Sequence, residues 1–124
     1  MVSSAKLLRM VEEIIALDTN MRFAAIIDLK GNIREAIMKA GKTSLKTQRE
    51  EEHFCKQVAQ RRQMRKDFDS SLGKVRYVHV EREKVSQMVV YTPKNTIYFT
   101  IEPELAVEEK IKLITKIKTM VSAL

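Results

Sequence analysis

The stretch IIDLKGNI, residues 26–33, joins two apolar segments through a short polar turn. Gly31 supplies the positive φ angle that a tight hairpin needs, so the stretch predicts two antiparallel strands. The strand before the turn is apolar from Phe23 to Ile27, a pattern typical of a strand covered on both faces of its sheet, and it should be central. The strand after the turn, over residues 33–38, mixes apolar residues with charged ones, which favours a place at the edge.

Two helices should flank this hairpin in the sequence. Ser3 or Ser4 can cap the first helix, which should run to about Asp18. Its apolar residues recur at the spacing of one buried stripe: Leu7, Leu8, Val11, Ile14 and Ile15. The second and longest helix should end at about Phe68. Its candidate caps are Thr43, Ser44 and a capping box from Thr47 to Glu50.

The carboxyl-terminal half predicts a meander of three strands followed by a helix. The runs VRYVHVER (75–82), VSQMVVYT (85–92) and TIYFTIE (96–102) are separated by short polar turns. Pro103 suits the first turn of the last helix. The buried stripe of that helix should consist of Val107, Ile111, Ile114, Ile117 and Val121.

These elements predict an α/β (α+β) three-layer sandwich with a five-stranded antiparallel sheet. The first and third helices should cover one face and the second helix the other. The length of 124 residues suits one domain over residues 1–124. The longest apolar runs are strand-sized, so no membrane span is expected. The amino-terminal stretch does not have the pattern of a secretory leader.

A cluster of basic residues lies on the second helix, and the net charge of the chain is +7. The cluster consists of Lys56, Arg61, Arg62, Arg65 and Lys66. One interpretation is a contact with nucleic acid or another polyanion. The other is a solvated helix end whose charges complement the helix dipole, because three acidic residues, 50–52, lie at the amino end. The aromatic residues of the strands are expected to pack beneath helices rather than stack on RNA; they are Tyr77, Tyr91, Tyr98 and Phe99.

The residue types that carry chemistry are sparse, and no catalytic residue, metal or cofactor is expected. His53 and Cys55 are two residues apart on a helix and so point to nearly opposite sides. His79 has no second ligand nearby and is predicted to be a packed or surface histidine. The sequence has no phosphate-binding loop. Its one cysteine cannot form an internal disulfide, which is consistent with a reducing cytoplasm, and is predicted to be a buried structural thiol.

The order of elements, together with the IIDLKGNI hairpin, resembles the roadblock/longin domains of the wider profilin-like group. The resemblance covers almost the whole chain, and it implies a non-catalytic scaffold or regulator for a small GTPase. Sensory PAS-type domains share much of this order, so a PAS-like ligand sensor is a further alternative. Against it stand the unbroken second helix and the lack of an aromatic-lined, glycine-punctuated pocket.

The second helix also predicts a homodimer. On a helical wheel Arg61 and Arg65 fall in the middle of an apolar side formed by Phe54, Val58, Met64, Phe68 and Leu72. An unpaired buried charge costs several kcal/mol. Either the two arginines extend to solvent beyond a short apolar patch, or the helix projects past the sheet and they meet acceptors on a second copy. The strand within KVRYVHVERE, residues 74–83, should be a polar edge able to pair with its symmetry mate. The predicted interface consists of Phe54, Val58, Arg61, Arg65, Phe68, Tyr77 and His79.

Overall fold

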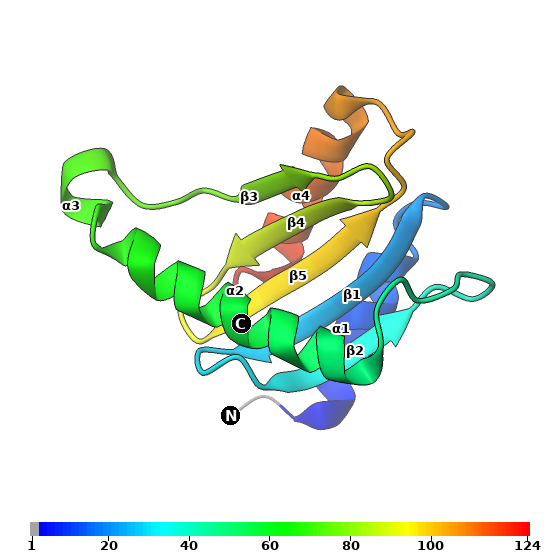
Figure 1. Cartoon of the computed structure of the whole chain (residues 1–124), viewed down its shortest axis with the longest axis horizontal. Coiled ribbons are helices and arrows are strands. Elements are labelled where there is room, and N and C mark those ends of the chain that lie inside the picture. Colours follow the sequence, from blue (N-terminus) through cyan, green and yellow to red (C-terminus); the bar gives the residue numbers. More distant parts are fainter. Residues whose placement is uncertain (1–2) are drawn as a thin grey trace.

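The computed structural model describes residues 3–124 and shows a five-stranded antiparallel sheet between two layers of helices (Figure 1). The strands are β1 (Met21–Asp28), β2 (Ile33–Met38), β3 (Val78–Glu81), β4 (Ser86–Tyr91) and β5 (Asn95–Ile101). The helices are α1 (Ser4–Ile15), α2 (Gln48–Lys66), the single-turn α3 (Asp69–Leu72) and α4 (Val107–Val121). The order across the sheet is β2-β1-β5-β4-β3. The predicted fold class and element order are confirmed.

The hairpin between β1 and β2 is held by the carboxylate of Asp28. Its Oδ1 accepts hydrogen bonds from the backbone N–H groups of Lys30 and Asn32, both at 2.9 Å. Gly31 has a φ of +92° and donates its N–H to the carbonyl of Asp28. As predicted, β1 lies inside the sheet, paired with β2 and β5, and β2 lies at an edge.

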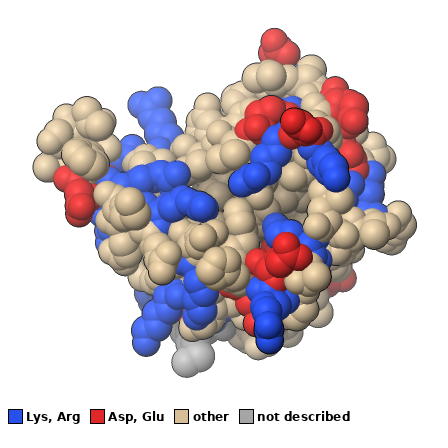
Figure 2. All heavy atoms as spheres, in the orientation of Figure 1, with Lys and Arg blue, Asp and Glu red and all other residues tan. Residues whose placement is uncertain are grey.

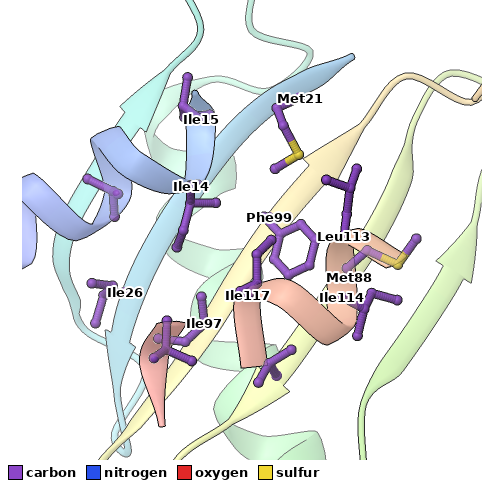
Figure 3. Close-up of a cluster of buried hydrophobic side chains, with 14 of the residues drawn as sticks. Ile14, Ile15, Met21, Ile26, Met88, Ile97, Phe99, Leu113, Ile114 and Ile117 are labelled. Atoms are coloured by element: carbon purple, nitrogen blue, oxygen red, sulfur yellow. The ribbon is translucent and has the colours of Figure 1, made fainter. Parts of the chain in front are cut away.

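The main core lies between the sheet and the pair α1 and α4 (Figure 3). Helix α1 contributes its predicted stripe except Leu8, which remains 40% exposed. The strands contribute alternate residues such as Ile26, Met88 and Phe99, because successive side chains of a strand point to opposite faces. A second, smaller core lies between the other face of the sheet and α2, and includes Ile27 and Tyr98. The predicted distribution of the helices over the two faces is therefore confirmed.

Several predicted boundaries were wrong. The first helix ends at Ile15, because the carboxylate of Asp18 accepts from the N–H of Asn20 and turns the chain into β1. The second helix ends at Lys66, before Phe68. Its capping box from Thr47 to Glu50 is confirmed, so neither Thr43 nor Ser44 is the cap.

In the carboxyl-terminal half the third strand and the last helix are shorter than predicted. Strand β3 covers only residues 78–81 of the predicted 75–82. Helix α4 is capped at Ala106 and begins at Val107, so Pro103 lies in the preceding turn rather than in the helix.

Gly31 also sets the distance between the hairpin and α2. A Cβ atom at this position would lie 2.8 Å from Cα of Lys56 and 3.0 Å from the carbonyl oxygen of Cys55. We expect Gly31→Ala to lower the free energy of unfolding by about 2–5 kcal/mol, because positive φ costs roughly 1–2 kcal/mol and overpacking roughly 1–3 kcal/mol. Urea denaturation would measure the loss.

Gly41 provides the matched control for this substitution. It also has a positive φ, of +83°, but an added Cβ would meet no atom within 4 Å. Gly41→Ala should therefore lose only the conformational part, about 1–2 kcal/mol. Equal losses in the two variants would show that the hairpin does not pack tightly against α2.

Candidate functional site

Helix α2 covers only part of its face of the sheet. Of its 19 residues only Cys55, Val58 and Ala59 are buried. Cys55 and Val58 pack with the smaller core over β1, β5 and Val89 of β4. Two adjoining hollows of about 620 and 230 Å³ lie between α2 and the strands β3 and β4. The two hollows share four lining residues, Phe54, Arg82, Gln87 and Tyr98, and together they are called the groove.

The floor of the groove is aromatic and carries a cation. The ring centroids of Phe54 and Tyr98 are 5.0 Å apart, and those of Phe23 and Tyr98 are 6.0 Å apart. Nζ of Lys46 lies 4.4 Å from the centroid of Phe54 and 2.9 Å from Oε2 of Glu51. An ammonium over an aromatic face is stabilised by the ring quadrupole, so Lys46 fastens the segment before α2 to the sheet.

Polar groups in the floor are only partly satisfied. The hydroxyl of Tyr98 accepts hydrogen bonds from Nε2 of Gln87 at 3.0 Å and from Nζ of Lys46 at 3.3 Å. Burial raises the pKa of the Tyr98 hydroxyl, so it stays protonated. Oε1 of Glu51 is buried and has no hydrogen-bond partner among residues 3–124. A buried acceptor without a donor costs free energy, and because this oxygen is itself buried, a molecule in the groove reaches it only when the side chain moves.

The turn between β3 and β4 forms the far wall of the larger hollow and is tied to α4. The carboxylate of Glu81 accepts from the hydroxyl of Ser86 at 2.7 Å and lies 3.0 Å from Nε2 of His79. Buried Lys110 of α4 donates to the same carboxylate at 3.1 Å. Hydrogen bonds from Ser86, His79 and Lys110 lower the pKa of Glu81 to about 2, against the smaller opposing effect of burial.

Three of the five residues of the basic cluster donate hydrogen bonds to other residues of the same chain. Arg62 donates to the carbonyls of Thr92 and Asn95 and to the hydroxyl of Thr96, at 2.6 to 3.0 Å. Arg65 donates to the hydroxyl of Tyr91 at 2.9 Å. Lys56 donates to the side chain of Asn32. The two remaining residues of the cluster, Arg61 and Lys66, are exposed.

The structure separates the residues predicted to form one interface. Phe54, Val58, Arg61 and Arg65 line the smaller hollow of the groove together with Val78 and Val80 of β3. His79 is on the opposite face, because its register partner Met88 belongs to the core beneath α1 and α4. Tyr77 precedes β3 and is 39% exposed. Phe68 lies beyond the end of α2.

The predicted apolar side of the second helix is buried only in its middle part. Of the five residues assigned to it, only Val58 is fully buried. Met64, Phe68 and Leu72 are 66%, 59% and 82% exposed. They form an apolar tip, carried by the end of α2 and by α3, which projects beyond the sheet (Figure 1). Of the four strand aromatics, Tyr98 and Phe99 are buried as predicted, Tyr91 is half-buried and Tyr77 is exposed.

Charge is divided between the two ends of α2. Basic side chains crowd the surface over its carboxyl-terminal half, whereas acidic and basic side chains are intermixed around its amino-terminal end and the turn between β3 and β4 (Figure 2). Glu50 and Glu51 lie in the first turn of the helix, and Arg65 and Lys66 in its last turn. The carboxyl-terminal half of the helix is thus the more basic one.

The sheet order and the helix layers define the class of protein: the chain has a roadblock/longin-like fold. An MglB structure with a tetrameric arrangement aligns at a TM-score of 0.80 and 11% identity, over 99% of this chain and 90% of that one. A Roadblock/LC7 domain from Streptomyces avermitilis aligns at 0.73 and 12%, over 94% and 92%. A profilin from Schizosaccharomyces pombe aligns at 0.67 and 12%, over 94% and 97%.

Within this fold the chain belongs to DUF6659, a family of unknown function, which it matches over residues 6–120. No curated protein sequence matches it. None of the helices within residues 3–124 is both long and apolar enough to cross a bilayer. Over the same residues, no group of three or more His, Cys, Asp or Glu side chains is placed to hold a metal ion.

The buried thiol of Cys55 gives a direct test of how firmly α2 sits on the sheet. Cys55 is fully buried, as predicted, and burial raises its pKa to about 12. Because the thiolate is the reactive form, we expect negligible reaction with a thiol reagent such as Ellman's reagent in native buffer at mildly alkaline pH. The same thiol should react fully in denaturing urea. Rapid labelling of the native protein would show that α2 lifts from the sheet.

The low pKa of Glu81 predicts a stability component that depends on pH. A carboxylate whose pKa is lowered by folding stabilises the protein above its unfolded pKa, near 4.5, and loses that contribution as the pH falls towards 2. The difference in denaturation midpoint between wild type and Glu81→Gln should therefore be largest above pH 5 and should shrink at lower pH. Glu83→Gln, which removes an exposed carboxylate of the same turn, should show little difference at any pH.

Proposed function

We propose that the chain acts as a non-catalytic protein-interaction module of the cytoplasm, in which residues 1–124 form a single roadblock/longin-like domain. It pairs with a second copy of itself through α2 and the free edge of β3, and the pair serves as a scaffold or regulator for another protein. The observation that carries this proposal is the groove. The sheet face under α2 is left partly uncovered there, next to β3, the strand at the edge of the sheet.

The edge formed by β3 is suited to pairing. Among residues 3–124 this strand has a neighbour, β4, on one side only, so its outer backbone groups make no sheet hydrogen bonds there. An exposed edge is a template for another strand unless it is blocked by charge, proline or a covering element. Val80 is 41% exposed on the groove side of β3. A second copy that pairs along β3 would extend the sheet and cover the groove.

Arg61 is the residue of α2 best placed to meet a second copy. Its guanidinium carbon lies 5.8 Å from the centroid of Phe54, at the open side of the groove. No carboxylate in residues 3–124 forms a salt bridge with it. Arg65 lies beside it but already donates to Tyr91, so Arg61 has the larger capacity for new bonds. Arginine is enriched in protein interfaces because its planar group binds carboxylates and carbonyls in a fixed geometry.

The role of the pair is supported by fold resemblance and by the chemistry of the groove. MglB, whose fold this chain shares, has been solved in a tetrameric arrangement. The suggestion that the regulated partner is a small GTPase rests on the roadblock/longin resemblance alone. A shared fold does not by itself establish a shared function. The groove has an aromatic floor on which Lys46 is held by Glu51, and its walls combine apolar side chains with the charged turn between β3 and β4. These properties suit a protein side chain as occupant.

The nucleic-acid and ligand-sensor alternatives have less support. Of the basic cluster, Lys56, Arg62 and Arg65 are bonded to other side chains or to backbone carbonyls, which leaves fewer donors for phosphates. A PAS-like sensor would hold its ligand between sheet and helices. Here that space contains the smaller core, and the groove beside it is open to solvent.

Light scattering tests the proposed pair. The wild type should have twice the chain mass of 14.4 kDa at micromolar concentrations. Arg61→Glu should weaken the dimer by about tenfold or more, because misplaced charge at an interface costs on the order of kcal/mol. Circular dichroism should stay at the wild-type level, since Arg61 is exposed.

The control is Arg9→Glu, which makes the same change of charge at an exposed position of α1 on the opposite face. It should leave the dimer intact. A wild-type monomer at these concentrations would remove the proposed pairing, and equal dimerisation of Arg61→Glu and wild type would remove α2 from the interface.

A further inference from the structure

A third hollow, of about 380 Å³, lies at the carboxyl-terminal end of α2. It is bounded by that helix, by the segment that leads from α3 to β3, and by the turn between β4 and β5. Its lining includes four basic residues, Arg62, Arg65, Lys66 and Lys74, and one acidic residue, Asp69, so three positive charges are in excess. It is called the basic hollow. Of its lining residues only Arg65 also lines the groove, so the two sites are distinct.

The basic side chains reach this hollow from two walls. Arg65 and Lys66 follow Arg62 by three and four residues on α2, so the three residues share one side of the helix. Lys74 comes from the segment that returns from α3 towards β3 (Figure 1). Basic side chains accordingly crowd the surface at this end of α2 (Figure 2). Like charges around one hollow repel each other, and a bound anion would remove that repulsion.

The two arginines of the basic hollow are held in place without a counter-charge. Both are half-buried. Arg62 donates to two backbone carbonyls and to the hydroxyl of Thr96, and Arg65 donates to the hydroxyl of Tyr91, so all of these acceptors are neutral. Within residues 3–124 none of the four basic residues of the hollow forms a salt bridge. Burial lowers the pKa of Arg62, as expected for a cation that lacks a carboxylate partner.

Hydrogen-bond donors remain available around the hollow. A guanidinium group has five N–H donors, of which Arg62 uses three and Arg65 uses one. The remaining N–H groups belong to side chains whose positions are already fixed by the fold. Guanidinium groups bind phosphate oxygens through paired N–H donors, so two positioned arginines are suited to this chemistry.

We propose that the basic hollow binds a small compound that carries two or more phosphate groups, with one site per chain. Its volume lies within the range of small-molecule pockets. A phosphate monoester carries a charge of about −1.5 to −2 near neutral pH, so at least two phosphates are needed to balance the three excess positive charges. Nucleic acid fits less well, because Lys56 and Arg61, the other basic residues of the α2 cluster, do not line the hollow.

Isothermal titration calorimetry with sodium tripolyphosphate, in a phosphate-free buffer at physiological salt, tests the site. We expect saturable binding of one tripolyphosphate per chain. The midpoint of thermal denaturation should rise in its presence, because a ligand that binds only the folded state stabilises that state. Inorganic phosphate should bind about tenfold more weakly or worse, because it contacts fewer of the cations.

A pair of lysine substitutions removes charge from the hollow without touching the arginines that bond to the fold. Lys66 and Lys74 are exposed, so Lys66→Gln combined with Lys74→Gln should fold normally. It should weaken tripolyphosphate binding by about tenfold or more, because charge-assisted bonds are lost. The matched control is Lys6→Gln combined with Lys116→Gln, which removes the same charge from exposed positions of α1 and α4 on the opposite face. This control should bind like wild type.

Asp69→Asn should change the affinity in the opposite direction. The carboxylate of Asp69 lines the hollow and repels an anion there. Its removal should tighten tripolyphosphate binding by about fivefold, since one repulsive charge at short range in water is worth about this factor. Unchanged or weaker binding in this variant would contradict the placement of the anion in the hollow.

Cosedimentation with lipid vesicles separates a free compound from a lipid headgroup, because the cardiolipin headgroup also carries two phosphates. The vesicles consist of phosphatidylcholine with cardiolipin. Binding that tripolyphosphate displaces, and that the Lys66→Gln and Lys74→Gln pair loses, would assign the phosphates to a headgroup. Binding of tripolyphosphate without binding of vesicles would assign them to a soluble compound.

Two results would overturn this inference. One is no binding of tripolyphosphate at physiological salt. The other is equal weakening by the two double variants, because binding would then follow the net charge of the chain and not the hollow. The test does not depend on the proposed pairing: a wild-type monomer that binds one tripolyphosphate per chain removes the pairing and keeps the site, and a dimer that binds none does the reverse.

Discussion

Strands β1 and β5 must be covered on both faces, and the rest of the structure follows from this requirement. All seven residues of β5 are buried, so a layer of helices is needed on each side of the sheet. Helices α1 and α4 provide one layer with broad apolar stripes. On the other face α2 buries only three residues, which is enough for the middle of the sheet but not for its β3 side. The groove exists because a narrow polar helix lies over a sheet that is wider than the helix.

A helix with so little apolar contact is held by polar contacts at its two ends. Before its first turn, Lys46 lies over Phe54 and pairs with Glu51. Near its last turn, Arg62 lies 4.7 Å from the ring of Tyr91 and donates to the carbonyls of the turn between β4 and β5. Guanidinium and ammonium groups combine a long apolar stem with several donors, so they can replace apolar burial at the margin of a core. Much of the basic cluster is therefore part of the fold.

The sequence was sufficient for the fold but not for the site. Three features could be predicted because each depends only on neighbouring residues in the sequence. They are the positive φ at Gly31, the capping box at Thr47 and the apolar run of β1. The direction of α2 could not be read in this way, because apolar residues lie both on the side that faces the sheet, such as Val58, and on the flank, such as Phe68. Periodicity does not distinguish a buried apolar residue from an exposed one. For the same reason His79 was placed on the groove side in place of Val78 and Val80, since the phase of a four-residue strand depends on its partner in the sheet.

Lys46 gives the groove a built-in competitor. Its ammonium already occupies the aromatic floor, within 4.4 Å of Phe54 and 5.3 Å of Tyr98. A molecule that binds to this floor must displace Lys46. Its apparent affinity is its intrinsic affinity multiplied by the fraction of protein molecules in which Lys46 is away from the floor. An occupant that only covers the walls escapes this reduction. For a partner of the proposed kind, the position of Lys46 thus favours shallow contact with the groove over deep insertion.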